Sequence, residues 1–75
     1  MPSAVEDIEQ NPVRLYRRSK GWTLDQMARS LGVNRQSIQA WETGGGYPAY
    51  PNVMKLAALD PDLPEALRKW RTGEG

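Results

Sequence analysis

Apolar residues recur along this chain at intervals of three and four, the spacing of one face of an α-helix. Two stretches show it over two full turns: Leu24, Met27, Ala28 and Leu31, and again Leu63, Ala66, Leu67 and Trp70. No stretch alternates apolar and polar residues with the period of two that a strand requires. The pattern therefore predicts an all-α chain.

Capping residues and helix breakers divide this pattern into five short helices, expected over residues 12–20, 23–31, 35–43, 51–59 and 62–71. Asparagine and threonine are preferred N-caps because their side chains accept a hydrogen bond from a free backbone N–H. The expected starts are an N-cap at Asn11, a T-x-x-Q capping box at Thr23–Gln26, an N-cap at Asn34, and a second capping-box-like start at Asp62–Glu65. Glycine follows the first three helices, where a left-handed residue closes the last turn.

The helix expected over residues 34–43 has polar and apolar residues on opposite sides. At 100° per residue, Ile38 and Trp41 point inward. The opposite side carries Gln36, Gln39, Ala40 and Thr43, with Arg35 at its edge. An ordinary solvent face would hold Glu and Lys, whereas amides, a hydroxyl, a small apolar group and one arginine are suited to contact base edges. We therefore expect this helix to enter the major groove of DNA.

Charge supports that expectation only in part. The chain has 75 residues, enough for one domain, and a net charge of +1. Residues 11–45 hold six basic and two acidic residues, a local net charge of +4, which suits a polyanion but also occurs on solvated helices. We expect a flexible acidic arm over residues 1–10, a DNA-binding domain over residues 11–71 and a polar tail over residues 72–75.

Catalysis has little support in the composition. The chain contains no histidine and no cysteine, so the commonest general base and the commonest soft metal ligands are missing. The glycine run at residues 44–46 lacks the pattern of a phosphate-binding loop. We expect no enzyme, no cofactor and no metal site. Without a long apolar run or a secretory segment, we expect a cytoplasmic protein associated with the nucleoid.

Periodicity also predicts one ion pair. Glu42 lies four residues after Ile38, on the flank of the buried face of its helix, and Arg17 lies four residues after Val13 on the matching flank of the first helix. Charged groups at such positions usually pair, because an isolated buried charge is costly. We expect an Arg17–Glu42 salt bridge; the alternative is that both side chains extend into water.

The same residues resemble a known family, the phage-repressor or Cro-like helix-turn-helix domains of the xenobiotic-response-element type. The resemblance covers about residues 13–59 and consists of V-R-L-Y-R at 13–17, T-x-x-x-M-A-x-x-L-G-V at 23–33, S-I-Q-A-W-E-x-G at 37–44 and P-x-x-x-x-L-A at 51–57. It implies a lambda-repressor-like fold and a repressor-like regulator of transcription. It also implies a recognition helix that lies in the major groove and reads it with its N-terminal residues. It also implies that Arg17 and Glu42 form a buried ion pair.

Carried onto this chain, the resemblance implies two classes of DNA contact. The base-facing positions are Arg35, Gln36, Gln39 and Ala40. Arg35 is suited to guanine, the glutamines to adenine and Ala40 to a thymine methyl group. The candidates for phosphate contacts are Thr23, Asn34, Arg14, Arg18, Lys20 and Thr43.

Three features depart from the family pattern. Leu24 stands where many members have a phosphate-binding glutamine, so Thr23 or backbone N–H groups must supply that contact. The loop at residues 44–46 has more glycine than usual. Tyr50 replaces the usual small hydroxyl before Pro51, so the next helix is expected to shift its start or to lose its cap.

A single small module makes few contacts, so we expect a homodimer on a palindromic site. Leu63, Leu67 and Trp70 are the expected dimer surface, with closure of the monomer core as the alternative. Two other functions stay open. The domain could be an antitoxin or adaptor whose main partner is a protein, or it could bind RNA or DNA without sequence preference.

Overall fold

Every regular element in residues 8–73, the part of the chain that this computed structural model describes, is helical. In chain order they are the short 3-10 turn η2 (Ile8–Gln10), α1 (Pro12–Ser19), α2 (Leu24–Leu31), α3 (Arg35–Thr43), α4 (Tyr50–Leu59) and α5 (Leu63–Thr72). The expected all-α class is confirmed. Most of the expected acidic arm (residues 1–7) and the last two residues of the expected tail lie outside the described residues.

Helix α1 begins at the expected residue and ends at Ser19, one residue before the expected end. The side chain of Asn11 accepts a hydrogen bond from the backbone N–H of Arg14 at 3.0 Å, which caps the first turn. Gly21 has a φ of +70°, a left-handed conformation that glycine adopts without strain. This turn lets the N–H of Trp22 donate to the carbonyl oxygen of Arg17 at 3.1 Å, which closes the C-terminal end of the helix.

Helix α2 begins with a capping box, and two local features at its other end fix the tight turn that joins it to α3. The expected capping box is present at the start of α2: Thr23 accepts from the N–H of Gln26 at 3.1 Å, and the Gln26 side chain accepts from the N–H of Thr23 at 2.8 Å. Gly32 ends α2 with a φ of +71°. The N–H of Val33 then donates to the carbonyl oxygen of Ala28 at 3.0 Å, and the chain reverses toward α3.

The start of α4 differs from the expected start by one residue. The helix begins at Tyr50, not at Pro51, and its N-cap residue Ala49 makes no side-chain hydrogen bond. The missing hydroxyl before the proline thus has the expected consequence, a shifted and uncapped helix start. Pro51 occupies an early helical position, where its lack of an N–H does no harm.

The capping box expected at Asp62–Glu65 is wrong. Asp62 precedes α5 but has helical backbone angles and makes no side-chain capping bond. Its own N–H is bound instead by the carboxylate of Asp60 at 3.0 Å, across the intervening Pro61. An aspartate that accepts from the N–H two residues later forms a local turn, and here that turn determines how α5 begins.

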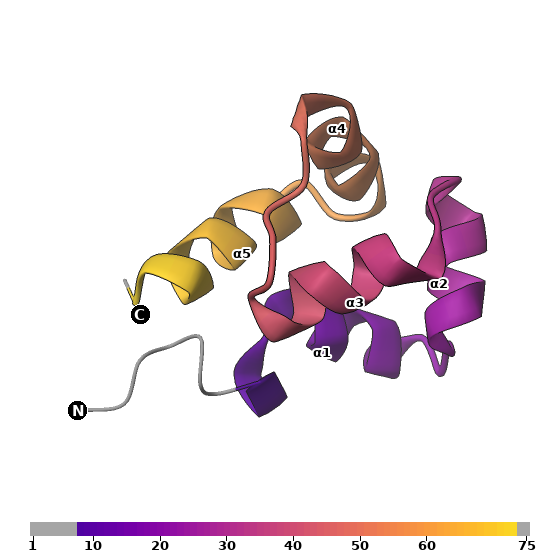
Figure 1. Ribbon diagram of the computed structural model, residues 1–75, viewed down its shortest axis with the longest axis horizontal. Coiled ribbons are helices and arrows are strands. Elements are labelled where there is room, and N and C mark those ends of the chain that lie inside the picture. The colour runs from indigo at the N-terminus through magenta and orange to yellow at the C-terminus, as the bar shows by residue number, and fades with distance from the viewer. Residues whose placement is uncertain (1–7, 74–75) are drawn as a thin grey trace.

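The helices enclose one core. Helix α3 lies against both α1 and α2, α5 packs on α1 and α4, and α4 also contacts α2 (Figure 1). The buried apolar residues are Val13, Met27, Ala28, Leu31, Ile38, Trp41, Leu56, Leu63, Leu67 and Trp70. Every one of the five α-helices therefore contributes to a single hydrophobic cluster, and that cluster sets the orientation of α3.

Leu63, Leu67 and Trp70 do not form a surface. Their exposed fractions within one chain are 3%, 0% and 7%, so they have almost no area left to bury against a second copy. The expectation that these residues form a dimer surface is therefore corrected. They close the core of the monomer, which was the alternative. The helical spacing of a core stripe and of an interface stripe is the same, so periodicity could not separate the two.

Candidate nucleic-acid interface

The outer face of α3 carries side chains that the fold does not use. Arg35, Gln36 and Gln39 are all exposed, and within residues 8–73 none of them makes a side-chain hydrogen bond or ion pair. Ala40 is half-buried at the edge of this face and packs against the core. The structure therefore brings the four expected base-facing residues together on one helix, three of them with free donors and acceptors.

Asn34 caps α3 and keeps a donor for a partner. Its side-chain oxygen accepts from both the backbone N–H and the hydroxyl of Ser37, at 2.8 and 2.9 Å. The side-chain NH2 group donates to no acceptor among the described residues. This amide is exposed at the N-terminal end of α3, where the helix dipole favours an anion, so it is suited to a phosphate oxygen.

A two-pronged ion pair fastens α3 to α1. The Nε and Nη2 atoms of Arg17 donate to the two carboxylate oxygens of Glu42 at 2.7 and 3.0 Å. The third donor, Nη1, reaches the carbonyl oxygen of Trp22 at 2.9 Å, so the same side chain also ties down the segment before α2. The side chains of Arg17 and Glu42 are 14% and 4% exposed. The salt bridge expected from periodicity is present, and it is buried.

The charge of Arg17 is secure. The hydrogen bond to Glu42 raises the pKa of the Arg17 guanidinium above its already high ordinary value, against the opposing effect of burial. Arg17 therefore stays protonated at every ordinary pH, and the orientation of α3 does not depend on a titration of this residue.

Asn11 makes a second link that the sequence did not reveal. Its side chain is fully buried, and while its oxygen caps α1, its Nδ2 atom donates to the carbonyl oxygen of Trp41 at 2.9 Å. This bond joins the N-terminal turn of α1 to the C-terminal half of α3. The one hint in the sequence is the residue type, because Asn offers a donor that Asp, Ser and Thr caps do not offer in the same position.

The candidates for phosphate contacts fall into two groups, and the first comprises Asn34, Thr23, Lys20 and Thr43, which make no ion pair among the described residues. The Thr23 oxygen accepts from the N–H of Gln26, which leaves its hydroxyl hydrogen available. The Lys20 ammonium lies 5.5 Å from the centre of the Tyr16 ring and is exposed. Thr43 differs, since its hydroxyl donates to the carbonyl oxygen of Gln39 at 3.0 Å within α3.

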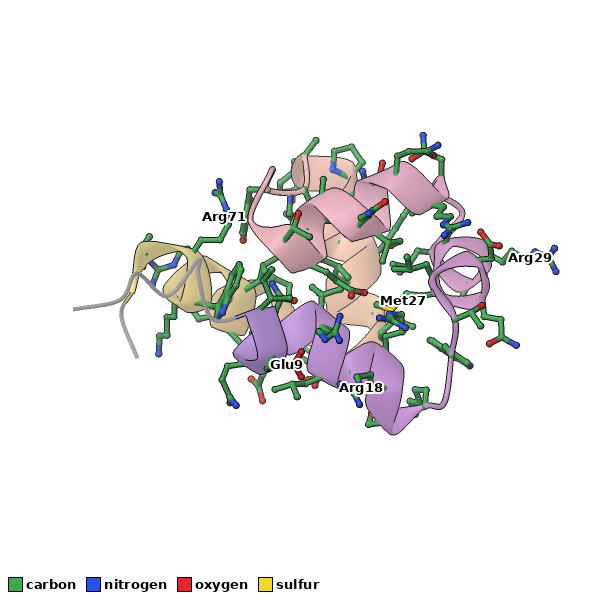
Figure 2. The ribbon with its side chains drawn as sticks, turned by 60° about the horizontal axis from the view of Figure 1, so that its bottom comes forward. Glu9, Arg18, Met27, Arg29 and Arg71 are labelled. Atoms are coloured by element: carbon green, nitrogen blue, oxygen red, sulfur yellow. The ribbon has the colours of Figure 1, made fainter. Side chains whose placement is uncertain are left out.

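The second group, Arg14 and Arg18, is already engaged with an acidic residue. The carboxylate of Glu9 lies 3.3 Å from Arg14 and 3.4 Å from Arg18. Figure 2 shows Glu9 and Arg18 on the same side of α1, turned toward the viewer, while Arg29 projects from the far end of the molecule. Nothing in the sequence marked Glu9 as a partner of these arginines, because it precedes α1 and its position depends on the turn of η2.

The glycine loop after α3 is folded back onto that helix. Gly44 has a φ of +80° and ends α3, and the N–H of Gly45 donates to the carbonyl oxygen of Ala40 at 2.9 Å. A side chain at Gly46 would touch the Ala40 methyl group, at 3.8 Å between the Cβ atoms. Tyr47 then anchors the loop, because its hydroxyl donates to the carbonyl oxygen of Pro64 at 3.2 Å.

Leu24, the most conspicuous departure from the family pattern, has a structural role. Its side chain is half-buried and packs against the core, so it adds apolar contact at the first turn of α2. A leucine has no donor for a phosphate. If a phosphate binds at this end of α2, the hydroxyl of Thr23 is the nearest side-chain donor along the chain.

Comparison with known proteins points to one family. A family model described as a helix-turn-helix matches residues 13–60. The chain is 34% identical over 59 residues to the cryptic phage CTXphi transcriptional repressor RstR of Vibrio cholerae, a match that covers 77% of this chain and 53% of that protein. It is 37% identical over 46 residues to a hypothetical transcription factor of Neisseria meningitidis, covering 61% and 43%.

The chain thus spans about half the length of the curated relatives it matches. No solved structure is significantly similar to it. Among the described residues, no helix has the length and apolar character needed to cross a membrane.

Proposed function

The chain belongs to the Cro/C1-type helix-turn-helix family of DNA-binding transcription regulators, and from that premise we propose that it binds duplex DNA sequence-specifically as a repressor-like regulator. The observation that carries this proposal is the outer face of α3. Three long polar side chains there are exposed and unpaired within the described residues, while the opposite face is fixed to α1 by a buried ion pair. A rigid helix with unused hydrogen-bonding groups matches what reading of base edges requires.

In this proposal α3 lies in the major groove and its residues have separate roles. Arg35 donates to guanine O6 and N7, Gln36 and Gln39 bind adenine, and Ala40 contacts a thymine methyl group. Thr23, Asn34 and Lys20 bind phosphates and fix the register without reading sequence, as such contacts do elsewhere. Since such a regulator acts where DNA is, we place the protein on the nucleoid in the cytoplasm.

The test begins with selection of bound duplexes from a random pool, and then compares Arg35→Ala with Lys20→Ala on the selected site and on its single-base variants. Both residues are exposed, so circular dichroism should show unchanged folding in both variants. Loss of Arg35 should weaken binding by about 1–3 kcal/mol and relax the preference at one base pair. Loss of Lys20 should weaken every duplex alike and reduce the slope of log K against log salt by about 1.

If both substitutions weaken every duplex equally, direct readout by Arg35 is wrong. If the selected site binds no more tightly than random duplex, the sequence-specific function itself is wrong, and binding without sequence preference takes its place. A specific site should be favoured by at least about 10³-fold.

We further propose that two copies bind a palindromic site through α4. With Leu63, Leu67 and Trp70 buried in the core, the large apolar side chains of α4 that stay exposed are Tyr50, at 75%, and Met54, at 55%. They lie four residues apart on one face of α4. A two-fold axis brings a surface against its own copy, so an uncharged stripe avoids like-charge repulsion.

Sedimentation with and without DNA tests this dimer. Met54→Glu should dissociate it, because the substitution places two like charges across the two-fold axis. The matched control is Leu15→Glu on α1, another exposed apolar residue, at 47%, which should leave the dimer intact. A wild-type protein that stays monomeric at high micromolar concentration, both free and on DNA, would refute the dimer.

A further inference from the structure

Glu9 occupies a position between two arginines of α1. Its Oε1 atom lies 3.3 Å from Nη2 of Arg14, and its Oε2 atom lies 3.4 Å from Nη1 of Arg18. The two arginines are four residues apart and therefore share one face of α1. One carboxylate thus faces both guanidinium groups, with one oxygen toward each.

The backbone around Glu9 holds it in this place. Residues 8–10 form the turn η2, which closes through a hydrogen bond from the N–H of Asn11 to the carbonyl oxygen of Ile8 at 3.0 Å. Asn11 is itself fully buried and bonded to the carbonyl oxygen of Trp41. The backbone turn that carries Glu9 is therefore anchored on the C-terminal half of α3.

The contacts themselves are weak enough to be exchanged. The side chain of Glu9 is 69% exposed and that of Arg18 is 57% exposed, and both N–O distances exceed those of a strong charged hydrogen bond. Water screens such pairs, so they contribute little to folding. A phosphate carries the same charge as the carboxylate and competes for the same donors.

We propose that Glu9 is an intramolecular competitor of the DNA backbone. In the free protein it occupies Arg14 and Arg18, and on DNA these arginines turn from the carboxylate to phosphates, so that each binding event exchanges an internal ion pair for an external one. The anchored turn keeps the carboxylate within reach of both arginines, so it competes with phosphates for them. This inference rests on the proposed binding of duplex DNA, and it adds a residue that lowers affinity for all sequences alike.

Two glutamine substitutions of equal charge change test it, Glu9→Gln and Glu65→Gln. Glu65 is paired with Arg68 on α5, so its substitution controls for the altered net charge. On a random-sequence duplex, followed by fluorescence anisotropy over a range of salt, Glu9→Gln should tighten binding about two- to fivefold, the range that one exposed ion pair spans. The Glu65→Gln variant should change affinity less. The gain should shrink as salt rises, since salt screens the competition.

A background that lacks both arginines, Arg14→Gln with Arg18→Gln, locates the effect. In that background, adding Glu9→Gln should increase the affinity for the random-sequence duplex no more than adding the control Glu65→Gln does. Equal gains from Glu9→Gln and Glu65→Gln, or a full gain in the background without the arginines, would overturn the competition.

The failure of this inference differs from the failure of the proposed function. If Glu9→Gln leaves random-duplex affinity unchanged while the selected site is still preferred, the competition is wrong and sequence-specific binding stands. If Glu9→Gln tightens random-duplex binding but no site is preferred, the competition stands and specific readout is wrong. If neither wild type nor variant binds any duplex at low salt, both are wrong.

Discussion

Loss of one partner should destabilise the fold far more at the Arg17–Glu42 pair than at any other ion pair among the described residues, and Arg17→Ala tests this. The substitution leaves the carboxylate of Glu42, whose side chain is 4% exposed, without either of its two donors. It also frees the carbonyl oxygen of Trp22. Stranding one partner of a buried pair costs about 3–5 kcal/mol, most of it the cost of an unpaired buried charge.

That loss is large for a chain of 75 residues. At about 0.05–0.15 kcal/mol per residue, such a domain is stable by roughly 4–11 kcal/mol in total. A loss of 1 kcal/mol lowers the Tm of a domain of this size by about 4–8 °C, so Arg17→Ala should lower it by at least about 12 °C. Circular dichroism at increasing temperature, with urea unfolding as a second probe, gives both quantities. Arg17→Lys keeps the charge but loses the fork, so it should recover only part of the loss.

The matched control is Arg68→Ala. Its partner Glu65 lies at 2.6 Å, closer than the Arg17–Glu42 contact, but both side chains are about half exposed. Water therefore screens the pair, and the Tm should move little. If Arg17→Ala and Arg68→Ala lower the Tm by the same amount, burial does not set the strength of these pairs and the reasoning is wrong.

Three further predictions concern capping, the glycine loop and pH. Asn11→Asp keeps the helix cap but turns an acceptor toward the carbonyl oxygen of Trp41, so urea unfolding should show a loss of about 1–3 kcal/mol, and a stability equal to wild type would contradict the buried link. Gly44→Ala should lower the Tm, because the φ of Gly44 is +80°. Gly46 has no such φ, so Gly46→Ala should leave the Tm unchanged; its added methyl group would touch Ala40 and should reduce discrimination at the base pair that Ala40 contacts. Equal Tm values for the two variants would argue against this. The hydrogen bond from Arg68 lowers the pKa of Glu65, so the ionised Glu65 stabilises the fold slightly above the ordinary pKa of a glutamate, and this stabilisation is lost as the pH falls through the lowered pKa. The stability of Glu65→Gln should therefore lack this dependence on pH in acid unfolding. An acid-unfolding profile equal to that of the wild type would exclude the contribution of Glu65.

Local signals predicted those helix ends where one side chain decides the outcome. Asn11, Thr23 and Asn34 each cap the helix that follows, because a short polar side chain reaches its own backbone whatever the rest of the chain does. The same logic failed at Asp62, whose side chain caps no N–H of α5. In a capping box the Asp62 N–H would be bound by the Glu65 side chain, but it is bound by the carboxylate of Asp60 instead. Spacing alone does not say which of these two carboxylates binds it.

Contacts between helices were predictable only where periodicity constrained both partners. The Arg17–Glu42 pair met that condition, since each residue lies on the flank of a buried face. The bond from Asn11 to Trp41 and the position of Glu9 did not, because each depends on how the N-terminal turn lies against another helix. The expected contacts of α3 with bases and phosphates remain predictions.

The separation between the two faces of α3 has a consequence for how such a protein can change over evolutionary time. The side chains that hold the helix in place point inward, and Arg35, Gln36 and Gln39 contribute no hydrogen bond or ion pair to the described fold. Substitutions at these three positions can therefore accumulate without loss of stability. A duplicated copy could acquire a new target sequence in a few mutational steps, each of which leaves a folded protein for selection to act on.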